Sequence, residues 1–101
     1  MRRLFIEKIK KTIQDWAAQY PQVELYIVEV YPSGIGENLH VIVVAAKGFE
    51  NWRQLAIRKD LFTFLRKQLG DTDVVKISKI LPLTEDEYEQ YELTRHETPI
   101  Y

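Results

Sequence analysis

Apolar residues near the start of the chain recur every three or four positions, and these are Phe5, Ile9, Ile13, Trp16 and Tyr20. Such spacing places them along one side of a helix, so the pattern predicts an amphipathic helix of about 17 residues. Pro21 ends this helix, because the residue before a proline avoids the helical conformation.

Two strand-like segments follow. Residues 23–31 are rich in β-branched and aromatic side chains, which are typical of a strand. Residues 39–46 are apolar at nearly every position, as expected of a central strand with both faces covered. Between them the chain carries a proline and the turn-forming residues Ser33, Gly34 and Gly36. We therefore expect a loop that lets the two strands form a hairpin.

The second half of the chain alternates helix and strand again. Gly48 interrupts the apolar run, and a second long helix is predicted over residues 50–69. Gly70 stands where a C-terminal cap belongs. A third strand is expected over residues 74–81, and Pro82 is expected to end it.

The C-terminal segment is rich in acidic residues. Thr84 and Glu87 have the spacing of a capping box, which predicts a short acidic helix over residues 85–92. Residues 94–101 are expected to form an irregular tail, so that one domain spans residues 1–93.

The predicted order is α-β-β-α-β with a terminal helix. This order predicts a single α/β (α+β) domain with a three-stranded mixed sheet, two long helices and a short C-terminal helix. The second long helix serves as a right-handed crossover, which makes the second and third strands parallel.

The amino-acid composition limits the kinds of site that the protein could contain. The chain of 101 residues has no cysteine and only two histidines, so we expect no disulfide, no metal site and no cofactor. No apolar run approaches the roughly 20 residues of a membrane-spanning helix. The start of the chain is basic, but charged residues interrupt the apolar segment that would have to follow it in a signal peptide. This argues against a signal peptide and favours a cytoplasmic protein.

Charge is unevenly distributed although the net charge is only −1. Residues 1–11 carry five basic groups and one acidic group, whereas residues 84–97 carry six acidic groups and one arginine. Solvated helix faces are the simpler interpretation of these segments. The alternative is a head-to-tail contact between the two ends, within one chain or between two chains.

Few residues are suited to catalysis. The loop around Ser33 offers only G-x-G and precedes a strand, so it lacks the helix N-terminus of a phosphate loop. His40 begins an apolar strand, where a structural histidine is the simpler interpretation. Tyr88 and Tyr91 lie three apart on the acidic helix, and we expect them to dock it onto the same chain or onto a second subunit.

The run "VEVYPSGIGENLHVIVVAAKGF", a helix, and then "VVKISKILPLTEDEYEQY" resemble the minimal, antitoxin-type nucleotidyltransferase-like domains over roughly residues 1–92. Those domains carry a G-S loop, a D-x-D strand and a further Asp on a third strand. The resemblance implies a ligand site at Ser33, Gly34, Gly36, His40 and Lys79.

The departures from that family change the expected activity. The two D-x-D positions fall at His40 and Ile42, and the third acidic position falls near Lys79. Two-metal nucleotidyl transfer needs carboxylates to hold the cations. The resemblance therefore implies a non-catalytic descendant, in which Lys79 replaces a lost cation and permits nucleotide binding without chemistry.

These observations favour a non-catalytic regulatory or subunit-type protein that binds a protein partner or a second copy of itself. The alternative is an RNA-binding module, because the order α-β-β-α-β is similar to KH-like ribosome-associated factors. That alternative depends on the basic N-terminal helix with Lys8, Lys10 and Lys11, since the chain lacks a G-x-x-G loop.

Overall fold

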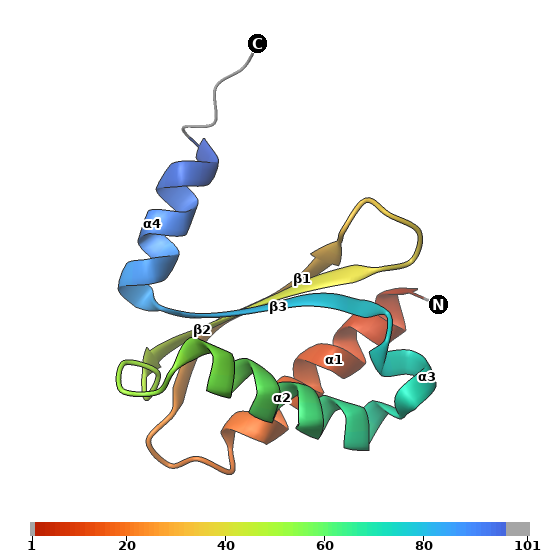
Figure 1. The fold of residues 1–101 in the computed structure, drawn as a ribbon, viewed down its shortest axis with the longest axis horizontal. Coiled ribbons are helices and arrows are strands. Elements are labelled where there is room, and N and C mark those ends of the chain that lie inside the picture. Colours follow the sequence, from red (N-terminus) through yellow and green to blue (C-terminus); the bar gives the residue numbers. More distant parts are fainter. Residues whose placement is uncertain (1, 97–101) are drawn as a thin grey trace.

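Three strands form the sheet at the centre of the molecule, in a computed structural model that describes residues 2–96 (Figure 1). β1 (Glu24–Pro32) pairs antiparallel with β2 (Leu39–Lys47). β2 pairs on its other side with β3 (Ile77–Thr84) in the parallel direction. The predicted mixed sheet with its hairpin is confirmed, and β2 is the central strand.

Helices α1 (Arg2–Ala17) and α2 (Gln54–Leu69) cover one face of the sheet, below the strands in Figure 1. The core between these layers consists of buried apolar side chains, among them Ile9, Ile13, Trp16, Val41, Val43, Ile57, Leu61 and Leu65. Their positions recur with helical spacing in α1 and α2 and alternate along β2, so the apolar pattern of the sequence dictates this layer. Gly70 ends α2 as predicted, with a φ of 92° and its N–H donated to the Arg66 carbonyl.

Helix α4 (Glu85–His96) lies over the opposite face of the sheet (Figure 1). Its first turn contains the predicted capping box. The Thr84 N–H donates to Glu87 Oε1 at 2.8 Å, and the Glu87 N–H donates to Thr84 Oγ1 at 3.2 Å. This pair of bonds fixes the direction in which the chain leaves β3.

The third strand differs from its predicted bounds. A short helix, α3 (Asp71–Val74), precedes it, and β3 begins only at Ile77. Pro82 was expected to end the strand but lies inside it. An edge strand tolerates proline because one of its sides makes no ladder hydrogen bonds.

Two helices also differ from prediction at one end. α2 begins at Gln54 rather than near residue 50, because residues 49–52 form a turn in which Trp52 N–H donates to the Phe49 carbonyl. α4 continues to His96, so residues 94–96 are helical rather than irregular. The run contains no glycine or proline to stop it. The rest of the predicted tail, residues 97–101, lies outside the described residues.

Candidate functional site

The loop with Ser33, Gly34 and Gly36 is the hairpin connection between β1 and β2. The Ser33 N–H donates to the Asn38 carbonyl at 2.9 Å, and the Ile35 N–H donates to Ser33 Oγ at 3.1 Å. Both glycines have positive φ values, of 92° and 56°. These two backbone donors are therefore used within the turn.

His40 and Lys79 lie side by side on the face of the sheet that α4 covers, since they are register partners across β2 and β3. Tyr31 is the register partner of His40 on β1, and the two rings meet edge-on with centroids 5.6 Å apart. The partly buried imidazole is thus held by an aromatic neighbour. β2 and β3 contain no carboxylate, and residues 2–96 contain no group of three His, Asp or Glu placed to hold a metal ion.

Tyr88 and Tyr91 dock α4 onto the sheet of the same chain. They pack against Ile42, Val44 and Leu83. The Tyr91 hydroxyl lies 3.4 Å from the Tyr31 hydroxyl. The structure therefore brings His40, Lys79, Tyr88 and Tyr91 to one face of the sheet and leaves the Ser33 loop at the end of the hairpin.

The Tyr88 hydroxyl lies between two carboxylates. Its single O–H proton is shared between Glu92 Oε1, 3.0 Å away, and Glu29 Oε2, 3.3 Å away. Burial, the hydrogen bond to Glu92 and the charge of Glu29 raise the pKa of Tyr88 to about 12. The neutral phenol is favoured because ionisation would place a third negative charge among the two carboxylates.

We expect Tyr88 to make the free energy of unfolding depend on pH in the alkaline range. Because the folded-state pKa lies above the ordinary value of 10.0, its contribution is complete below pH 10 and is lost as the pH rises towards 12. Tyr88→Phe should be less stable than wild type by about 1–2 kcal/mol at pH 8. The difference between the two should shrink above pH 10 in urea unfolding curves. A difference that stays constant to pH 12 would contradict this assignment.

A basic groove of about 530 Å³ runs between α2 and β3. Its rim carries Arg58 and Lys59 of α2 and also Lys79, which stands on the edge strand β3 and borders α4 as well. Its floor includes Phe62 and Ile80. No carboxylate lines the groove, and none of the ion pairs within residues 2–96 involves its three cations. We call these five residues the basic groove. Of these five residues only Lys79 was predicted from the sequence, although the pairs 58/62 and 59/63 share the i,i+4 spacing of one helix face.

The free edge of β3 beside this groove is poorly suited to pairing with another strand. Ser78 is an extra residue in the register with β2, since Leu39 pairs with Ile77 and His40 with Lys79. Gln54 Nε2 donates to the Pro82 carbonyl at 2.8 Å. Bulges, lysine and proline are features that block edge-to-edge pairing. Contacts at this edge are therefore made by side chains.

An acidic face lies at the opposite edge of the sheet, beside β1. Glu85, Glu89 and Leu93 follow one another at every fourth position of α4, and Tyr26 of β1 lies across a hollow of about 500 Å³ from them. Tyr26 is 57% exposed and Leu93 is 52% exposed. Tyr26 projects there because it is an extra residue in the register between β1 and β2. We call these four residues the acidic face.

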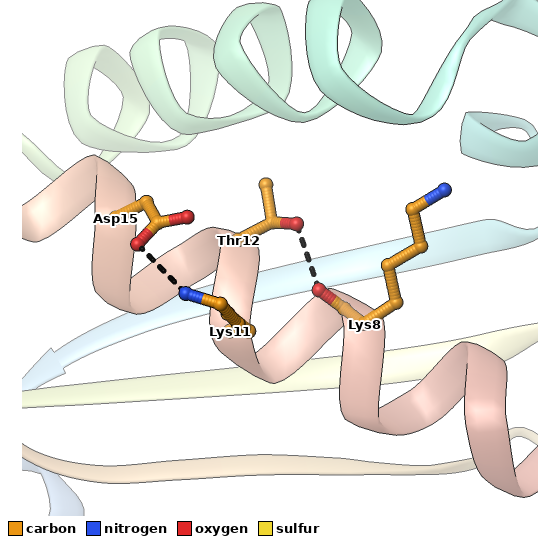
Figure 2. A network of polar contacts seen from close by, with 4 residues as sticks. All are labelled: Lys8, Lys11, Thr12 and Asp15. Atoms are coloured by element: carbon orange, nitrogen blue, oxygen red, sulfur yellow. Dashed lines mark hydrogen bonds and ion pairs between the residues drawn. The ribbon is translucent and has the colours of Figure 1, made fainter.

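One of the two acidic residues of the basic N-terminal helix forms an ion pair within that helix. Figure 2 shows Lys11 directed at Asp15 with Nζ 3.6 Å from Oδ1, and Thr12 directed at the Lys8 carbonyl. Lys10 is half-buried, whereas Lys8 and Lys11 are exposed. RNA binding by this helix remains a prediction.

Comparison with known proteins identifies no relative of this chain. No protein-family model matches the chain, and no curated protein or solved structure matches it. Within residues 2–96, none of the helices has the length and apolar character needed to cross a membrane.

Proposed function

We propose that this protein is a non-catalytic interaction module that holds an acidic segment of a protein partner in the basic groove. The observation that carries the proposal is the groove itself, in which Arg58, Lys59 and Lys79 surround an apolar floor and no carboxylate is among the lining residues. Its size suits part of a peptide or a helix face. Apolar contacts would supply affinity, and the cations would select an acidic partner.

The proposal treats the protein as a regulatory or subunit-type member of a nucleotidyltransferase-like fold that lacks catalytic residues. It is supported by the parallel pairing of β2 with β3 and by His40, Ile42 and Lys79 at the positions where the family carries acids. A cytoplasmic location is part of the same proposal.

A protein partner is favoured over RNA by two features. The groove floor contains Phe62 and Ile80, which favour contact with apolar side chains. The net charge of −1 gives no long-range attraction for a polyanion. Binding of a nucleotide or an RNA in the same groove is therefore treated as an outcome of the test.

The test is binding of a fluorescent acidic amphipathic peptide of about twelve residues, rich in Glu and Leu. We expect Arg58→Gln with Lys59→Gln to weaken binding at least about tenfold, because two cations of the rim are removed. The matched control is Arg66→Gln with Lys67→Gln, which removes the same charge from the same helix outside the groove. This control should bind within about twofold of wild type.

A control peptide and two competitors, magnesium ATP and single-stranded RNA, distinguish a protein partner from a nucleotide or an RNA. A peptide with Lys in place of Glu should not bind. Equal loss of affinity in the groove variant and its control would overturn the proposal, because binding would then follow net charge alone. Displacement of the peptide by magnesium ATP or by single-stranded RNA, with tighter binding of that competitor, would assign the groove to a nucleotide or to RNA instead.

A further inference from the structure

The same chain carries a surface whose charge is opposite to that of the basic groove. Glu85 and Glu89 are exposed carboxylates on one ridge of α4, and the exposed Leu93 continues this ridge. Tyr26 of β1 lies across a hollow of about 500 Å³ from this ridge. The two surfaces lie at opposite edges of the sheet, one beside β1 and the other beside β3.

We infer that the occupant of the basic groove is the acidic face of a second copy of this chain, so that the protein assembles head to tail. Glu85 and Glu89 of one copy approach Arg58, Lys59 and Lys79 of the next. This inference rests on the proposed function, because it fills the same groove, and it names the partner.

The apolar residues of the two surfaces favour the same contact. Tyr26 and Leu93 are 57% and 52% exposed, and they flank the two carboxylates. Phe62 and Ile80 form part of the groove floor between the cations. In a specific interface, apolar side chains are typically surrounded by charged groups, which are of one sign on one partner and of the opposite sign on the other. Burial of the apolar side chains supplies affinity, and the charges fix the register.

Charge also excludes the symmetric alternatives. Two basic grooves facing each other would bring six cations together, and two acidic faces would bring carboxylates together. Like charges placed opposite each other oppose association. Pairing of strand edges is disfavoured as well, because Ser78 and Tyr26 are extra residues in the registers of the two edge strands. A heterologous contact remains, and it leaves one groove and one acidic face open at the ends of every open assembly.

The test measures mass by light scattering and sedimentation between about 10 µM and about 1 mM, the range of weak interfaces. We expect the mean mass to rise above the 12.0 kDa of one chain with concentration. Raising the salt from about 50 mM to about 500 mM should lower it again, because salt screens exposed charges.

Two neutral variants test the geometry. Arg58→Gln with Lys59→Gln removes the groove cations, and Glu85→Gln with Glu89→Gln removes the acidic ridge. Each variant alone should stay monomeric. An equimolar mixture should form a complex of two chains and nothing larger, because only one native junction can form. The matched controls, Arg66→Gln with Lys67→Gln and Glu7→Gln with Asp15→Asn, should assemble like wild type, and equal melting curves for all variants check that each is folded.

The outcomes separate this inference from the proposed function. A mass of 12.0 kDa over the whole range, or a mixture that stays monomeric, overturns head-to-tail assembly. If the acidic peptide still binds the groove in that case, the proposed function stands and its partner is another protein. Association that persists equally in both variants assigns the contact to a different surface, and loss of both assembly and peptide binding overturns both proposals.

Discussion

Replacing Gly48 by alanine is expected to lower the free energy of unfolding by about 4 kcal/mol, which is a large part of the stability of a small domain. Gly48 has a φ of 104°, a conformation that costs other residues about 1–3 kcal/mol. A Cβ atom there would also lie 2.6 Å from the Gln22 carbonyl oxygen and 2.7 Å from Val23 Cα. Both contacts are with backbone, so the connection from α1 to β1 would have to move.

The measurement is thermal or urea unfolding of Gly48→Ala beside Gly34→Ala. Gly34 is a matched control, because its φ is 92° and no atom would lie within 4 Å of an added Cβ. We expect the control to cost about 1–2 kcal/mol from backbone strain alone. The difference of at least about 2 kcal/mol should appear as a melting temperature lower by roughly 10 °C or more. Equal costs at the two positions would show that close approach at Gly48 is unimportant.

Gly48 also shows which parts of the fold are predictable from the sequence. Its role as a break after β2 is local and visible in the apolar pattern. Its close approach to Val23 depends on how the α1–β1 connection packs, which no local pattern contains. The helices, the order of elements along the chain and the capping box of Thr84 were predictable, because spacing and cap residues act within a few positions.

Register was harder to predict than element order. Tyr26 and Ser78 are extra residues in their strands, so the side chains on either side of them do not follow simple alternation. Simple alternation would place Leu25 and Ile27 on one face of the sheet. Instead Leu25 packs in the core with α1 and α2, and Ile27 packs under α4. A bulge depends on the neighbouring strand, so the sequence of one strand does not reveal it.

The candidate site shows the same limit. The acidic ridge of α4 was visible as charge, because it lies within one short segment. The basic groove was missed, since Arg58 and Lys79 are 21 positions apart in the numbering and meet only because β2 and β3 are joined by a crossover. Tyr88 and Tyr91 were recognised as docking residues, but the sequence left open which chain they contact.

The second large effect is expected at Asp60, whose carboxylate joins α2 to the aromatic cluster at the end of α1. Asp60 Oδ2 accepts hydrogen bonds from Trp16 Nε1, at 2.9 Å, and from the Tyr20 hydroxyl. Trp16 is fully buried, and its ring stacks on Trp52 with centroids 6.0 Å apart. Asp60→Ala should lower the free energy of unfolding by about 2–4 kcal/mol, because it removes two bonds to a charged acceptor and leaves a buried indole N–H unpaired.

Urea unfolding followed by tryptophan fluorescence measures this loss, with Asp15→Ala as the matched control. Asp15 is an exposed helical carboxylate paired only with Lys11 among the described residues, so its loss should cost no more than about 0.5 kcal/mol. A second measurement, the titration of Tyr20, reports specifically on its hydrogen bond to Asp60. The hydrogen bond to Asp60, followed by burial and by the charge of Asp60, raises the pKa of Tyr20 above 10.0. Asp60→Ala should return that pKa towards 10.0, whereas an unchanged Tyr20 titration would show that the carboxylate does not hold the phenol in solution.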